Sequence, residues 1–139
     1  QGFSGSLPVR PAELQRRLPR HAQLILIGDF LGPVAELAPV LADYAAAGLG
    51  GYVLQVLDPA EETLPFKGRI RFRSPEPEDD LLVPRVEDLR KRYIDRLATH
   101  RAALSDLVRG LGWHFATHRT DHPPQLALLA AFNALTADR

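Results

Sequence analysis

Runs of apolar residues predict the strands of a small sheet. The run that starts at Leu24 has no polar interruption before it ends in Asp29, which is typical of a strand buried on both faces that delivers one carboxylate to its end. A second run ends in Asp58, just before Pro59. We expect strands at residues 24–29, 51–57 and 113–118.

Helical spacing of apolar residues predicts the elements between the strands. The longest pattern keeps Leu97, Leu104 and Val108 on one face, while Arg, Lys and Asp mainly occupy the other. In the last helix four residues are spaced for packing, namely Leu126, Leu129, Ala130 and Asn133. The predicted helices cover residues 11–20, 39–47, 86–111 and 125–135.

Prolines and a glycine bear on the bounds of the helix that follows the first strand. Gly32 and Pro33 open it, because proline is tolerated in the first turn of a helix. Pro39 then predicts either a kink or a later start, and we place the regular helix at residues 39–47. Gly48 is expected at the position just after this helix, where glycine favours termination.

The order of these elements predicts the fold class. A strand, a helix and a strand in close succession form a βαβ unit, which requires a right-handed crossover and parallel pairing. Residues 69–83 alternate in polarity around a turn and predict a hairpin, with Arg69, Arg71 and Arg73 on one of its faces. We therefore expect an α/β fold, a three-layer sandwich with a small, mostly parallel sheet plus a β-hairpin insert.

Composition narrows the classes of function. The 139 residues are enough for one domain with a hydrophobic core. With 17 basic and 17 acidic residues the formal net charge is zero, whereas a nucleic-acid or membrane-surface role would predict a basic excess. Without Cys there is no disulfide framework and no thiolate nucleophile or metal ligand. We expect a cytoplasmic protein with neither nucleic acid nor membrane as its partner.

The chain also contains no Met, which indicates a processed chain or a fragment. Gln1 and Gly2 resemble the scar left by a protease-cleavable tag. We therefore expect residues 1–6 to be a tag remnant and residues 7–139 to form a single α/β domain of a larger protein.

Four motifs occur in a specific order along the chain. They are Leu26-Ile27-Gly28-Asp29-Phe30, Leu54-Gln55-Val56-Leu57-Asp58-Pro59-Ala60-Glu61, Pro65-Phe66-Lys67-Gly68-Arg69 and His118-Arg119-Thr120-Asp121. The series resembles the carboxyl-terminal half of a bacterial family of domains of unknown function, number fifty-eight, which is similar to von Willebrand factor A-type domains. The resemblance covers residues 20–135, most of the chain.

The resemblance implies a function and a cofactor. Members of this family are found beside MoxR-type AAA+ ATPases, so the chain is expected to be a protein-interaction module, not an enzyme, that partners such an ATPase in assembling or remodelling proteins. Von Willebrand A-type domains bind a divalent cation through an Asp-x-Ser-x-Ser motif, a Thr and an Asp after the fourth strand. Asp29 matches only the last of these. The resemblance thus implies Mg²⁺ in the intact protein, with Asp29 as one ligand, and no cofactor in this chain by itself.

Two interpretations of Asp29 and Asp58 are open from the residues alone. As a metal ligand, Asp29 needs further oxygen donors, and Asp58 is the nearest by topology. Alternatively, each carboxylate accepts hydrogen bonds from the backbone N–H groups of the turn that follows it. A metal-dependent hydrolase that uses Asp29, Asp58 and His118 is the alternative to the interaction module.

The other metal-like residues lie near the last strand, at His114, His118, Asp121 and His122. A zinc site draws its ligands onto one face, but His114 and His118 are about 13 Å apart in an extended strand. That separation is too large for one ion. We therefore expect residues 118–121 to form a hydrogen-bonded turn between the strand and the last helix.

Two surfaces are expected to meet other proteins. The first is an interaction surface made of Asp29, Phe30, Asp58, Arg69, Arg71 and Arg73. The second is the edge of the strand at residues 24–29, because in the order 3-2-1-4-5-6 of an A-type sheet its neighbour would be absent here. A bare apolar edge invites pairing, so we expect a homodimer through this strand or a cover such as residues 11–20.

Overall fold

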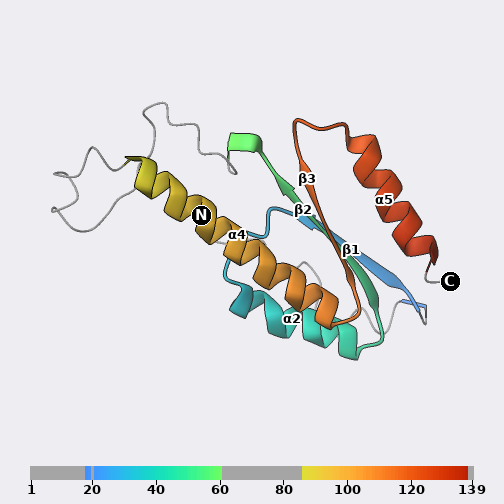
Figure 1. Ribbon diagram of the computed structural model, residues 1–139. Helices are drawn as coiled ribbons and strands as arrows, with labels where there is room; N and C mark the ends of the chain where they lie inside the picture. The colour runs from blue at the N-terminus through green and yellow to red at the C-terminus, as the bar shows by residue number, and fades with distance from the viewer. Residues whose placement is uncertain (1–17, 20, 61–85, 138–139) are drawn as a thin grey trace.

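The computed structural model describes residues 18–19, 21–60 and 86–137. The elements follow one another as β1 (Gln23–Gly28), α2 (Val34–Ala46), β2 (Gly50–Leu57), α4 (Val86–Gly110), β3 (His114–Arg119) and α5 (Pro124–Ala137). In Figure 1, α2 and α4 lie on one side of the sheet and α5 lies on the other. The predicted α/β sandwich is confirmed. The predicted hairpin at 69–83 lies outside the described residues, as does nearly all of the predicted helix at 11–20.

The sheet has the order β1-β2-β3 and is parallel throughout. Leu26 is in register with Val53, and Val53 with Phe115, so these three side chains share one face. We call it the first face, and it is the one that α2 and α4 cover. The alternate residues point to the opposite side, which we call the second face and which comprises Ile25, Ile27, Tyr52, Leu54, Val56, His114, Ala116 and His118.

The hydrophobic core lies on the first face. Side chains of α2, α4 and the sheet interlock there around Leu41, Leu104 and Val108, which have no exposed surface. The Trp113 ring packs over Gly51, where a Cβ atom would lie only 2.1 Å from the ring. Its indole Nε1 donates a hydrogen bond to the Leu49 carbonyl oxygen at 3.0 Å. Glycine is therefore required at Gly51 by the close approach of the indole.

Both helices of the first face end in the same way. Gly48 follows α2 with φ 84° and Gly112 follows α4 with φ 77°, left-handed values that glycine adopts without steric cost. Each glycine turns the chain so that the next residue closes the helix with a backbone hydrogen bond. These bonds run from Leu49 N–H to Tyr44 O (3.3 Å) and from Trp113 N–H to Val108 O (3.1 Å). The predicted terminator at Gly48 is confirmed.

The helix α2 begins earlier than predicted. It starts at Val34, and Pro39 lies inside it, so the predicted start at Pro39 is wrong. Proline removes the hydrogen bond that its N–H would donate to Ala35 O, four residues back. Both residues are exposed, so water can serve this carbonyl, and the helix accommodates the proline.

Two burial predictions are wrong, and both concern the second face. The strand β1 is not buried on both sides, because Ile25 and Ile27 are 47% and 64% exposed. In α5 the four residues expected to pack, Leu126, Leu129, Ala130 and Asn133, are all exposed. The half-buried side of α5 carries Ala127, Ala131, Ala134 and Leu135 instead, and α5 packs against β3.

No helix among the described residues is both long and apolar enough to cross a membrane.

Candidate functional site

The turn after β1 places Asp29 at the carboxyl edge of the sheet. Its Oδ1 accepts a hydrogen bond from Leu31 N–H at 3.3 Å, which confirms the expected backbone-capping role. The next residue, Phe30, has φ 51°, and its ring is 4% exposed within the core. Phe30 therefore cannot belong to an exposed interaction surface as predicted. Asp29 is exposed and Phe30 anchors the turn beneath it.

A buried amide holds this turn from below. Gln55 on β2 has no exposed surface, and its Nε2 donates a hydrogen bond to the Asp29 carbonyl oxygen at 2.9 Å. Its Oε1 accepts a hydrogen bond from Arg101 Nε of α4 at 3.3 Å. His100 Nε2, also of α4, bonds the Phe30 carbonyl oxygen. These contacts tie the end of β1 to β2 and α4 at one point. Both ends of the Gln55 amide are bonded, as a buried amide requires, since burial without hydrogen bonds is costly.

Sequence reasoning missed Gln55, Arg101 and His100. The available signal was a polar residue inside an otherwise apolar strand, at Gln55. Such a residue in a buried strand needs hydrogen-bond partners, but its partners here lie 26 and 46 residues away. The sequence alone does not say which residues they are.

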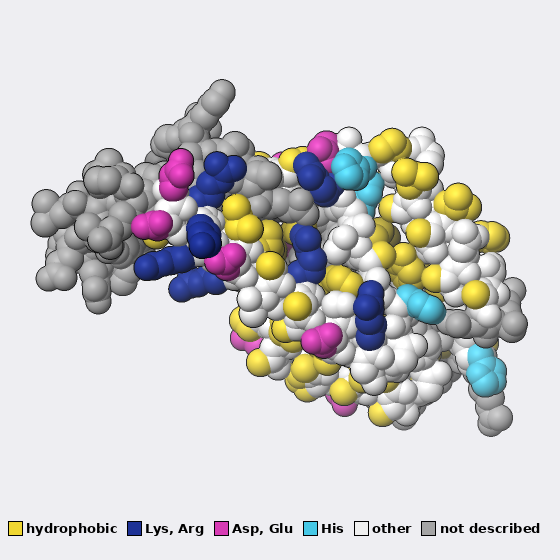
Figure 2. Space-filling model, in the orientation of Figure 1, with side chains coloured by type: hydrophobic (Ala, Val, Ile, Leu, Met, Phe, Trp, Pro, Cys, Tyr) yellow, Lys and Arg dark blue, Asp and Glu magenta, His cyan; other side chains and the backbone are white. Residues whose placement is uncertain are grey.

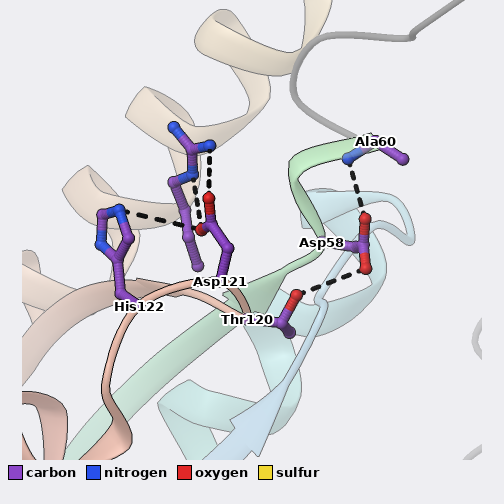
Figure 3. A network of polar contacts seen from close by, with 6 residues as sticks. Asp58, Ala60, Thr120, Asp121 and His122 are labelled. Carbon is purple, nitrogen blue, oxygen red and sulfur yellow. Dashed lines mark hydrogen bonds and ion pairs between the residues drawn. The ribbon is translucent and has the colours of Figure 1, made fainter.

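The turn after β2 is linked to the turn after β3 (Figure 3). Asp58 Oδ1 accepts a hydrogen bond from Ala60 N–H at 2.8 Å, which is again the capping role expected of it. Its Oδ2 accepts a hydrogen bond from the Thr120 hydroxyl at 3.3 Å. Thr120 N–H in turn donates to the Leu57 carbonyl oxygen at 3.1 Å. The ends of the two neighbouring strands are thereby held in a defined arrangement.

Beyond Thr120, charged side chains continue this network at the surface. Arg119 donates to both oxygens of Asp121, from Nε at 3.2 Å and from Nη2 at 3.1 Å. His122 Nε2 lies 3.8 Å from Asp121 Oδ1 (Figure 3). The predicted hydrogen-bonded turn between strand and helix is confirmed. Asp121 and His122 are exposed and Arg119 is half-buried, so these ion pairs contribute little to stability. They place charges of both signs side by side at this surface.

The residues proposed as metal ligands do not come together. Within the described ranges no three His, Asp or Glu side chains are placed to share an ion, and Asp29, Asp58 and His118 all lie in those ranges. His118 belongs to the second face, in register with Val56, whereas the two carboxylates lie in the turns beyond their strands. A cation at Asp29 would need further oxygen donors, so the residues described here do not fit a complete metal site. Asp29 as one ligand in the intact protein stays a prediction.

The remaining predicted surface residues, Arg69, Arg71 and Arg73, lie outside the described residues, so their place near the carboxyl edge stays a prediction.

Burial raises the pKa of two tyrosines. Tyr44 lies in the core of the first face and Tyr52 lies on the second face, with its ring centroid 6.3 Å from that of His114. In both cases desolvation disfavours the charged phenolate and raises the pKa above its ordinary value of 10.0. Neither hydroxyl lies in the turns at the carboxyl edge, so this effect concerns stability and not the candidate site.

Comparison with known proteins gives a family but no activity. A model of the family described as "Protein of unknown function DUF58" matches residues 2–103. An uncharacterized protein of Mycobacterium tuberculosis and one of Mycobacterium bovis are each 31% identical over 120 residues, covering 86% of this chain and 37% of the relative. An uncharacterized protein of Mycobacterium avium is 30% identical over 120 residues, covering 70% of that relative. No solved structure matches.

The chain therefore spans little more than a third of the length of the first two of these relatives.

Proposed function

We propose that this chain, which belongs to the DUF58 family, is a protein-interaction module similar to part of a von Willebrand A-type domain, and that its carboxyl edge binds a MoxR-type AAA+ ATPase. The binding surface consists of Asp29, Asp58, Thr120, Asp121 and Arg119, and extends to Arg69, Arg71 and Arg73 of the predicted hairpin. In this proposal the module helps the ATPase to assemble or remodel other proteins.

The observation that supports the proposal is the network that joins Asp58 to Thr120 and Arg119 to Asp121. Asp58, Thr120 and Asp121 are exposed and Arg119 is half-buried, and hydrogen bonds join them in two pairs (Figure 3). A surface of this kind loses little side-chain entropy on binding, which favours affinity. Its mixed charges also suit recognition of a complementary protein surface rather than of a uniformly charged polymer.

The chemistry of the carboxylates also favours docking over catalysis. Asp29 Oδ1 and Asp58 Oδ1 each accept a hydrogen bond from the backbone, and Asp58 Oδ2 accepts one from Thr120. A carboxylate used in this way shapes a turn, whereas a general base must reach the proton that it removes. The Mg²⁺ implied for the intact protein would have to draw its other ligands from outside the described residues.

The test is a binding measurement between this chain and a purified MoxR-type ATPase from the same bacterium, with the ATPase immobilised and the chain in solution. Asp121→Arg reverses a charge in the middle of the surface and separates Arg119 from its partner, so we expect binding about tenfold weaker. Asp106→Arg is the matched control. Asp106 is an exposed aspartate near the C-terminus of α4, and this end of the helix lies away from the carboxyl edge of the sheet.

Circular dichroism of both variants establishes that they fold. Absence of binding by the unmodified chain would overturn the proposal, as would equal binding by the unmodified chain and Asp121→Arg. Loss of binding in Asp106→Arg alone would place the contact elsewhere and would equally overturn it.

A further inference from the structure

The backbone of the turn after β1 has a conformation that few residues adopt. Phe30 has φ 51°, in the left-handed region, which is unfavourable for a residue that carries a Cβ atom. Its ring is part of the hydrophobic core, so a glycine at this position would lose that packing. Contacts from elsewhere must therefore stabilise the turn, because a strained residue persists only where its surroundings fix it.

The carboxylate of Asp29 depends on this backbone conformation. Its Oδ1 accepts a hydrogen bond from Leu31 N–H, so the two bonded groups lie on either side of Phe30 along the chain. A change in the backbone angles of Phe30 moves the Leu31 N–H relative to the carboxylate and disrupts this bond. The position of the exposed Asp29 side chain at the carboxyl edge is thus linked to the conformation of Phe30.

A histidine of α4 holds one of the two carbonyl groups of the turn. His100 Nε2 bonds the Phe30 carbonyl oxygen, and a carbonyl oxygen only accepts hydrogen bonds. Nε2 must therefore carry a proton, and the imidazole is the donor. The two residues are 70 positions apart, so this bond joins the turn to a distant part of the chain.

An arginine of α4 holds the other carbonyl group through Gln55. A guanidinium only donates, so the bond from Arg101 Nε at 3.3 Å identifies the Gln55 atom that it meets as the oxygen. The amide nitrogen then points at the Asp29 carbonyl oxygen, at 2.9 Å. Exchanging the two ends of this buried amide would place donor against donor and acceptor against acceptor. Two adjacent residues of α4 thus hold two adjacent carbonyl groups, one directly and one through Gln55.

The part of α4 that makes these contacts is itself fixed. His100 and Arg101 lie between Leu97 and Leu104, which are both buried. From position 87 to position 96 nearly all side chains are exposed, and Figure 2 shows charged side chains gathered over this first part of the helix. The contacts with the turn therefore begin where α4 becomes anchored in the core, so they give the turn a firm support.

We propose that His100, Gln55 and Arg101 are positioning residues for the carboxyl edge, which hold Phe30 in the left-handed conformation and thereby hold Asp29 in place. They act through the turn and are not part of the binding surface. As far as binding is concerned, the inference rests on the proposed function. The conformation of the turn can be measured without any partner, so the two can fail separately.

Backbone chemical shifts report the conformation of the turn in the free chain. His100→Phe keeps a ring but removes the donor to Phe30. Gln55→Glu keeps an acceptor for the arginine but removes the donor to Asp29. In both variants we expect the Cα and Cβ chemical shifts of Phe30 to leave the left-handed range, and the Leu31 amide to exchange faster with solvent. If the charge of Gln55→Glu prevents folding, His100→Phe decides the outcome.

Two further variants separate positioning from a general loss of structure. His100→Gln restores an amide donor and should retain the chemical shifts of the unmodified chain. His114→Phe is the matched control, since His114 is a half-buried histidine at the start of β3, away from the carboxyl edge, and it should leave the shifts of Phe30 unchanged. Unchanged shifts of Phe30 in His100→Phe would overturn the inference, as would equal changes in His100→Phe and His114→Phe.

Binding to the immobilised ATPase tests whether the turn matters to the surface. We expect His100→Phe to bind about fivefold more weakly than the unmodified chain, and to cause no further loss when combined with Asp29→Ala, because His100 acts through Asp29. Unchanged binding by His100→Phe, or an equal loss in both backgrounds, would overturn the positioning role. Absence of binding by the unmodified chain would instead overturn the proposed function, and the chemical shifts of Phe30 would then decide whether α4 holds the turn.

Discussion

The two faces of the sheet differ in what covers them. The first face is covered by α2 and α4, and the buried cluster around Leu41, Leu104 and Val108 lies there. On the second face α5 packs against β3, Tyr52 and Leu54 of the central strand are nearly fully buried, and Ile25 and Ile27 of β1 are exposed. The strand β1 supplies both faces with aliphatic residues, Leu24 and Leu26 on the first face and Ile25 and Ile27 on the second. The difference on β1 therefore comes from the elements that cover each face, and it separates a face that carries the hydrophobic core from a face with exposed apolar side chains.

The largest expected effect comes from the first face. Leu104→Ala removes a side chain with no exposed surface, and the loss of burial plus the cavity should lower the free energy of unfolding by about 2–5 kcal/mol. On the second face Leu129→Ala removes an exposed side chain, and at low protein concentration the loss should stay below about 1 kcal/mol. Urea unfolding of both variants measures the two losses. Equal losses would remove the distinction between the faces.

A smaller effect is expected where the sheet meets the end of α4. Gly51→Ala puts a Cβ atom 2.1 Å from the Trp113 ring, so either the ring or the strand must move, at a cost of about 1–3 kcal/mol. Gly110→Ala is the control, because nothing lies within 4 Å of the added Cβ and alanine favours the helix. The midpoints of thermal unfolding compare them. If Gly51→Ala were as stable as the unmodified chain, the indole could not pack as described.

The smallest expected effect is a loss of folding stability at alkaline pH, to which one tyrosine on each face contributes. Burial raises the pKa of Tyr44 and Tyr52 in the folded protein above 10.0, so above pH 10 the unfolded state gives up these protons first. Stability from this source is complete below pH 10 and declines as the pH rises through the folded-state values. Denaturant unfolding at a series of pH values should show a shallower decline for Tyr44→Phe and for Tyr52→Phe. An unchanged slope in both variants would contradict the assigned cause.

Much of the first face could be predicted from the sequence because its signals are local. The strands, the helix that carries Leu97, Leu104 and Val108, and the glycine after α2 all follow from short patterns of residue type. The capping roles of Asp29 and Asp58 follow from the residue and the turn after it. Each of these features is determined by contacts within a few positions along the chain.

The second face could not be predicted in the same way. The sequence of α5 is apolar on all sides, so no periodicity shows that Ala127 and Ala131, and not Leu126 and Leu129, turn toward the sheet. The exposure of Ile27 depends on where α5 packs relative to β1, and that position is set by the whole fold.

The candidate site was predictable only in part, for the same reason. The link between Asp58 and Thr120 joins residues 62 positions apart, and that between Gln55 and Arg101 spans 46. No pattern along the chain names such pairs, although the parallel sheet brings the ends of its strands together.

Hydrogen exchange of the folded chain tests most directly whether the two faces differ in how firmly their helices are packed. Amides of α4 between Leu97 and Val108 should exchange slowly because this segment packs into the core, whereas amides of α5 should exchange faster because its large apolar side chains are mostly exposed. Equal protection of the amides of α5 and of this segment of α4 would contradict the account.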